Sequence, residues 1–84
     1  MKVNVIFFGD FARFKPAEWE RRRGTVEVQE GATIDALAEQ LGVGDESCVV
    51  MLNDEQHHRG APLHEGDTVT FLPPIAGGAP RPVG

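Results

Sequence analysis

The sequence predicts one α+β domain, in which a main helix packs on one face of a mixed sheet of roughly four to five strands. Several short runs alternate between apolar and polar residues, which is the pattern of half-buried strands. One further segment carries apolar residues at helical spacing between a capping threonine and a glycine. The chain has 84 residues. That length supports only one modest core, so we expect a single sheet and a single helical layer.

The first two strands are expected to form a hairpin. Lys2–Phe8 alternates from its start. The side chains predicted to point into the core are Val3, Val5 and Phe7. Ile6 and Phe8 fall on the other face, which is therefore either covered by another element or an apolar docking surface. Thr25–Gln29 alternates most cleanly and is expected to pair with the first run.

The segment between these strands mixes aromatic and charged residues. Pro16 suits the first position of a short helical turn, which the residues after it are expected to form. The basic run Arg21–Arg23 either contacts an anion or phosphate, or is the solvated edge of a loop before a turn at Gly24. The acidic chain around this run favours the solvated edge.

A helix of roughly two to three turns is expected between Thr33 and Gly42. Thr33 is a suitable N-cap, and the charge of Asp35 favours the first turn because it opposes the helix dipole. The apolar stripe consists of Ile34, Leu37, Ala38 and Leu41. Gly42 ends the helix, since glycine readily adopts the left-handed conformation.

Two more strands follow the helix. Ser47–Leu52 is almost continuously apolar, which favours a central strand. Cys48 within it is expected to be a small buried hydrophobe rather than a reactive thiol. Asn53 and Asp54 open a turn. After a short irregular stretch, Thr68–Leu72 forms the last strand.

Composition disfavours several classes of function. The net charge of −5 argues against nucleic acid as a partner. The single cysteine rules out an internal disulfide. No signal-peptide core or membrane-length apolar run is evident, so we expect a cytoplasmic protein without a membrane partner. His57, His58 and His64 are interpreted as solvated turn residues rather than metal ligands, because no carboxylate or cysteine completes a site.

The order strand, strand, helix, strand, strand favours a β-grasp, or ubiquitin-like, roll. In that fold the first and last strands are parallel neighbours in the middle of the sheet. Ile6, Phe8 and Leu72 would then meet on the face away from the helix, beside the start of the C-terminal segment. An apolar patch in that position is a candidate docking surface for a partner protein.

The C-terminal segment that follows is poor in side chains and ends its first part in a diglycine. Two prolines stop strand pairing and favour an extended exit. The residues expected to thread into a narrow active site on another protein are Pro73, Pro74, Ile75, Ala76 and Gly77. We therefore divide the chain into a β-grasp domain (1–72), a flexible diglycine tail (73–78) and an extension (79–84).

These residues resemble the MoaD/ThiS family of sulfur carrier proteins from Val3 to Gly78. The most specific segment runs from Leu63 through Gly66-Asp67 to Pro73-Pro74 and the diglycine. Weaker similarity is carried by Val5-Ile6-Phe7-Phe8 and by the helix from Gly31 to Gly42. The phenylalanine pair and the Pro-Pro step are more similar to the molybdopterin-synthase small subunit than to the thiamine carrier.

The resemblance implies a carrier that is not itself an enzyme and binds no cofactor. A ubiquitin-activating-type enzyme would use ATP to adenylate the Gly78 carboxylate, and a sulfur donor would convert it to a thiocarboxylate. That sulfur would pass to a synthase or large subunit, as in molybdopterin biosynthesis.

The extension 79–84 departs from the family pattern, because typical carriers end at the diglycine. Related proteins with such an extension are processed by a JAMM-type metalloprotease and tend to serve other sulfur pathways, so the pathway stays open. A ubiquitin-like modifier joined to lysines through Gly78, a β-grasp binding module without tail chemistry, and an unprocessed, inactive chain are the alternatives.

Overall fold

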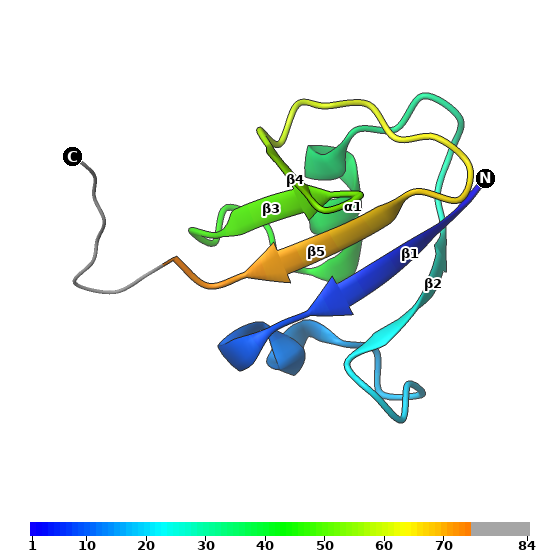
Figure 1. Cartoon of the computed structure of the whole chain (residues 1–84). Coiled ribbons are helices and arrows are strands. Elements are labelled where there is room, and N and C mark those ends of the chain that lie inside the picture. The colour runs from blue at the N-terminus through cyan, green and yellow to red at the C-terminus, as the bar shows by residue number, and fades with distance from the viewer. Residues whose placement is uncertain (75–84) are drawn as a thin grey trace, which may run out of the picture.

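Residues 1–74, which the computed structural model describes, form a five-stranded mixed sheet with one α-helix against one of its faces (Figure 1). The elements in chain order are β1 (Lys2–Phe7), the 3-10 helix η1 (Gly9–Phe14), β2 (Arg23–Glu27), α1 (Ile34–Leu41), β3 (Val49–Leu52), β4 (Glu55–His57) and β5 (Thr68–Leu72).

The strand order is β2-β1-β5-β3-β4, with β5 in the middle. β1 and β5 run parallel, whereas every other neighbouring pair in this sheet is antiparallel. The β1–β2 hairpin, the crossover through α1 and the parallel pair β1–β5 together make the β-grasp arrangement, so the predicted fold is confirmed.

The core lies between the sheet and α1, where alternate strand residues meet the apolar stripe of the helix. The largest fully buried side chains are Phe7, Phe71, Ile34, Leu37, Val3, Val5 and Val69. The rings of Phe7 and Phe71 stack across the parallel pair with their centroids 5.6 Å apart. Each such side chain contributes about 1.5–3 kcal/mol through burial, so this layer holds most of the stabilising apolar contact.

The ends of α1 lie where the sequence predicts them. The Thr33 hydroxyl accepts a hydrogen bond from the backbone N–H of Ala36 at 3.2 Å, which satisfies one donor of the first turn. Gly42 has φ +85°, and its backbone N–H bonds to carbonyls of the last turn. The N-terminal turn is also tied to the loop before β5, because the N–H of Asp35 donates to the Arg59 carbonyl at 2.7 Å.

The segment between β1 and β2 differs from its prediction. The helical piece is η1, which comes before Pro16, and Pro16 itself begins only a single turn closed by the N–H of Trp19 at 3.0 Å. Arg23 and Gly24 lie in β2 rather than in a loop and a turn, so this strand begins and ends two residues before the predicted Thr25–Gln29. Trp19 explains the glycine: a Cβ at Gly24 would lie 2.5 Å from the indole Cε2.

The stretch after β3 also contains a strand that the sequence pattern does not predict. β3 begins at Val49, two residues later than expected, and has a neighbour on both sides. Asn53 and Asp54 form the predicted turn with φ +52° and +73°, as tight hairpin turns require. This turn places β4, a polar three-residue strand, at the sheet edge where an irregular stretch was predicted. Within residues 1–74, no helix is long and apolar enough to cross a membrane.

Candidate functional site

The face of the sheet turned away from α1 carries a row of side chains that crosses all five strands. In β1, β5 and β3 their neighbours along the strand are buried in the core, so these residues lie on the opposite face, and the strand register places the residues of β2 and β4 in the same row. In spatial order the row is Arg23, Ile6, Thr70, Met51 and Gln56, each paired with the next in the strand register. Its centre is apolar on both sides of Thr70, and its two ends are polar.

A second, shorter row lies nearer the end of β5. Val49 is paired with Leu72, and Phe8 continues the parallel ladder because its N–H donates to the Phe71 carbonyl at 2.9 Å. Phe8 is 45% exposed and is the one large apolar side chain classed as exposed within residues 1–74. Leu72 and Val49 are partly buried.

We call the apolar residues of these two rows the outer patch; it consists of Ile6, Phe8, Val49, Met51 and Leu72. The structure places the three predicted docking residues, Ile6, Phe8 and Leu72, on this one face. The sequence prediction missed Val49 and Met51, because the unbroken apolar run of β3 hides which residues face outward. A signal was nevertheless available in the sequence. The residues of β5 alternate clearly, and beside such a strand every second residue of the apolar β3 must face outward.

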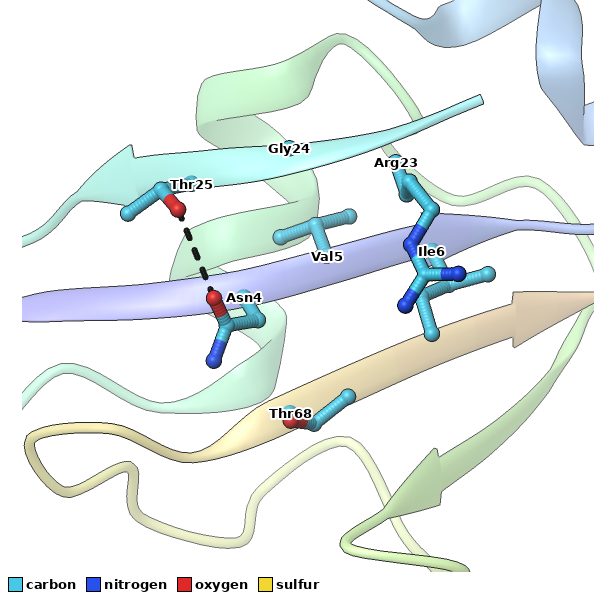
Figure 2. A pocket seen from close by; sticks show the side chains of 7 residues that line it. All are labelled: Asn4, Val5, Ile6, Arg23, Gly24, Thr25 and Thr68. Carbon is cyan, nitrogen blue, oxygen red and sulfur yellow. Dashed lines mark hydrogen bonds between the residues drawn. The ribbon is translucent and has the colours of Figure 1, made fainter. Parts of the chain in front are cut away.

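One end of the outer patch borders an open hollow of about 410 Å³. It is lined by Asn4, Val5, Ile6, Arg23, Gly24, Thr25 and Thr68. Figure 2 shows the Arg23 side chain reaching from β2 toward Ile6, with which it is paired in register. The Thr25 hydroxyl donates to the Asn4 side-chain oxygen at 3.3 Å and closes the opposite end (Figure 2).

The root of the C-terminal tail lies at the same edge as the second row. β1 and β5 run parallel and end together, so β5 leads the chain out beside Phe8 (Figure 1). Pro73 is partly buried against the turn after β1: a Cβ on Gly9 would lie 3.1 Å from the Pro73 Cγ, and Gly9 has φ +57°. Pro74 is exposed.

The rest of the predicted tail lies outside the described residues. This applies to Ile75, Ala76, Gly77, Gly78 and the extension 79–84. The roles of these residues in threading and acyl transfer therefore stay predictions, as does the division of the chain at residues 72 and 78.

The titratable side chains form no second site in the part of the chain that the structure describes. Cys48 is partly buried and packs against the core just before β3. Burial raises the pKa of its thiol, Arg59 lowers it to a lesser degree, and Glu46 adds a small increase, so the reactive thiolate is disfavoured. Within residues 1–74, no group of three or more histidine, cysteine or acidic side chains could hold a metal ion.

Each of the three histidine side chains interacts with a residue close to it in the sequence. His57 lies in β4, 3.7 Å from the Glu55 carboxylate, and His64 lies 3.7 Å from that of Asp67. The ring of His58 accepts a hydrogen bond from the backbone N–H of Gly60 at 3.1 Å. These contacts tie each ring to its own turn or hairpin.

Comparisons with solved structures agree with this geometry. Small archaeal modifier protein 1 of H. volcanii superposes with a TM-score of 0.71 at 21% identity, covering 88% of this chain and 98% of that one. A structure of SAMP1 from Haloferax volcanii gives 0.67 at 25% identity, covering 93% and 100%. A complex of subunits 1 and 2 of the molybdopterin-converting factor from Helicobacter pylori 26695 gives 0.61 at 25% identity, covering 93% and 100%.

No curated protein sequence matches the chain. The model of the ThiS family, in contrast, matches residues 5–78, from the second half of β1 through the outer patch to the diglycine that ends the predicted tail. This match covers most of the chain, and it agrees with the β-grasp topology and the parallel β1–β5 pair. The chain therefore belongs to the ThiS family of small, ubiquitin-like sulfur carriers.

Proposed function

We propose that this protein is a sulfur carrier whose reactive group is the Gly78 carboxylate, exposed by proteolytic removal of residues 79–84. In this proposal a ubiquitin-activating-type enzyme adenylates Gly78 in the cytoplasm with ATP, and the resulting thiocarboxylate donates sulfur to a cofactor or another sulfur metabolite. The carrier supplies the acyl group and the docking surface; it binds no cofactor itself, and its partners carry out the catalysis.

The observation that carries this proposal is the coincidence of the family match with the geometry. The matched region ends at Gly78. In the described part of the chain, the apolar outer patch lies beside the end of β5, which is followed directly by Pro73 and Pro74. A partner that covers the patch would hold the root of the tail, while its own active site lies within reach of the diglycine. The sequence from Ala76 to Gly78 has almost no side-chain bulk, which suits entry into a narrow active site.

The proposed chemistry uses no side chain of the carrier as acid, base or nucleophile. A Gly78 carboxylate oxygen attacks the α-phosphorus of ATP, pyrophosphate leaves, and an acyl adenylate forms. The terminal sulfur of a persulfide then attacks the acyl carbon and AMP leaves. A thiol reduces the resulting acyl disulfide and releases the thiocarboxylate. Adenylation is needed because an unactivated carboxylate carries a poor leaving group.

Two partners follow from this proposal. The subunit 1 structure from Helicobacter pylori 26695 is bound to a subunit 2 of the molybdopterin-converting factor. We infer a corresponding large subunit, or another sulfur-accepting synthase, for this chain. The extension 79–84 implies a JAMM-type protease that acts before activation.

The test is direct activation of the processed chain. A chain ending at Gly78 should catalyse no reaction alone, but with the adenylating enzyme of its own genome it should support ATP–pyrophosphate exchange. Adding a sulfur donor should then raise its intact mass by the exchange of one oxygen for one sulfur. The matched controls are the 84-residue chain and a chain ending at Ala76, both of which should stay unmodified. Equal exchange with the Ala76 chain would overturn the proposal.

A second candidate is a ubiquitin-like modifier, which the similarity to SAMP1 favours. Modifier activity uses the same acyl adenylate but transfers the acyl group to a lysine amine instead of to sulfur. Gly78-dependent conjugates of higher mass in cells, with no thiocarboxylate in the purified chain, would select this candidate.

A further inference from the structure

The side chains that line the hollow beside the outer patch carry positive charge and no negative charge. Its lining contains one charged side chain, the Arg23 guanidinium, and no carboxylate. The remaining side chains that line it are amide, hydroxyl or apolar groups, and two of the polar ones, Asn4 and Thr25, are already bonded to each other. A charged group entering this hollow therefore meets a single positive charge beside an apolar wall formed by Ile6 (Figure 2).

Arg23 differs in this respect from Arg13 and Arg59, the two arginines of residues 1–74 that form ion pairs. Arg13 pairs with Glu46 at 3.0 Å, and Arg59 pairs with Asp35 at 3.0 Å. Within residues 1–74, Arg23 makes no ion pair and no side-chain hydrogen bond. In a chain with a net charge of −5, an exposed arginine without a carboxylate partner next to an apolar patch is open to a partner's charge.

The position of Arg23 makes this charge part of the docking surface. Arg23 lies directly opposite Ile6 in the β1–β2 register, at one end of the row that crosses the sheet. A protein that covers Ile6, Met51 and Leu72 would also cover the hollow. A planar guanidinium donates two parallel hydrogen bonds to a carboxylate, which fixes the orientation of the partner as well as adding attraction.

We propose that the partner which covers the outer patch inserts an aspartate or glutamate side chain into the hollow, where it pairs with Arg23. This inference rests on the proposed function, because it takes the adenylating enzyme as that partner. The apolar contact would supply the area of the interface, and the Arg23–carboxylate pair would fix how β1 and β2 sit against the partner.

The test measures ATP–pyrophosphate exchange by the adenylating enzyme as a function of the concentration of the chain ending at Gly78. Arg23→Gln should raise KM about tenfold at a salt concentration of about 0.05 M, with kcat unchanged, and the difference should shrink at about 0.5 M because screening shortens the range of the interaction. Arg23→Lys should recover part of the loss, since lysine keeps the charge but not the fork.

Lys2→Gln is the matched control, because it removes the same charge from the other end of β1, where Lys2 is paired with Glu27. It should change KM less than about twofold at the same low salt. If Arg23→Gln leaves KM unchanged, or if Lys2→Gln raises KM equally, the inference is wrong and the proposed function stands. If the unsubstituted chain supports no exchange at all, both are overturned.

A double-mutant cycle then identifies the partner residue. The acidic residues of the enzyme's carrier-binding face are changed one at a time to their amides, in the presence of the unsubstituted chain and of Arg23→Gln. One substitution should raise KM with the unsubstituted chain and have little further effect with Arg23→Gln. Additive effects at every acidic position would overturn the pairing.

Discussion

The two faces of the sheet are made by the same strands, yet their side chains are used differently. In β1, Val3, Val5 and Phe7 are completely buried in the core, whereas the intervening Ile6 is only partly buried, and Phe8, directly after the strand, is 45% exposed. The core face is closed by the helix and by Trp19. The outer face carries the apolar outer patch between polar ends, and no element of residues 1–74 is packed over it (Figure 1).

Under the proposed function, this difference separates the residues that stabilise the fold from those that bind a partner within single strands. A domain of this size is only marginally stable, and burying more apolar surface of its own would stabilise it. The outer patch instead keeps that surface available, at the edge where the tail begins. Residues that alternate along one strand should therefore produce opposite phenotypes when substituted: unfolding on one face, weaker docking on the other.

The largest contrast is expected between Phe7 and Ile6. Phe7→Ala removes a fully buried ring that stacks on Phe71 and lies 6.1 Å from the Trp19 ring, so the free energy of unfolding should fall by about 3–5 kcal/mol. Ile6→Ala should cost less than about 1 kcal/mol, because its side chain is outside the core cluster. Urea titrations of the two variants measure both values. Equal losses would show that the outer face also carries the fold.

On the core face, Gly24 in β2 is covered by the Trp19 ring rather than by α1. Gly24→Ala should lower the free energy of unfolding by about 1–3 kcal/mol, since the new methyl group would overlap the indole. The chain has one tryptophan, so its fluorescence reports directly on the displaced ring. Thr25→Ala, at the exposed next position, is the control and should change little. A blue-shifted, fully stable Gly24→Ala protein would contradict the predicted clash.

These cases also show what the sequence could predict. β1, α1 and β5 have regular apolar periods and clear ends at Thr33, Gly42 and Pro73, and the predicted spans agree with the structure to within a residue. β4 could not be found by its period, because Glu55, Gln56 and His57 are polar and the strand is formed by the tight turn before it. Gly24 was misread as a turn, since its close contact with Trp19 depends on tertiary structure.

Predicting the site had the same limit. The alternation of β1 and β5 was enough to place Ile6, Phe8 and Leu72 on one face. Val49 and Met51 needed the register with β5, which fixes which half of an entirely apolar strand faces outward. Arg23 needed the β1–β2 register in addition, because a run of three arginines does not indicate which of them lies beside the patch.

Met51 and Leu72 offer the next test, with a smaller effect on folding than on docking. Met51→Ser and Leu72→Ser should each raise KM for adenylation of Gly78 about tenfold, which corresponds to about 1.4 kcal/mol of lost contact. Their free energies of unfolding should fall by less than about 1 kcal/mol, because neither side chain is in the core cluster. Glu39→Gln, exposed on α1, is the control for the opposite face. Unchanged KM in both serine variants would remove the outer patch as the docking surface.

The smallest expected effect concerns Cys48, because the reactivity of its thiol measures how well the core is shielded from solvent just before β3. Its thiol is shielded by burial, with Arg59 acting in the opposite direction and Glu46 reinforcing the effect, so its pKa lies above the usual value of 9.0. The folded state therefore favours the protonated form: this contribution to stability is present below the unfolded pKa and is lost as the pH rises through the folded pKa.

Iodoacetamide should label the native Cys48 thiol more slowly than the thiol of the urea-unfolded chain, and the midpoint pH of labelling should be higher in the native protein. Glu46→Gln should move the native midpoint down, because it removes a negative charge that disfavours the thiolate. Equal labelling rates in the native and unfolded chains would show that the fold does not shield the Cys48 thiol from solvent.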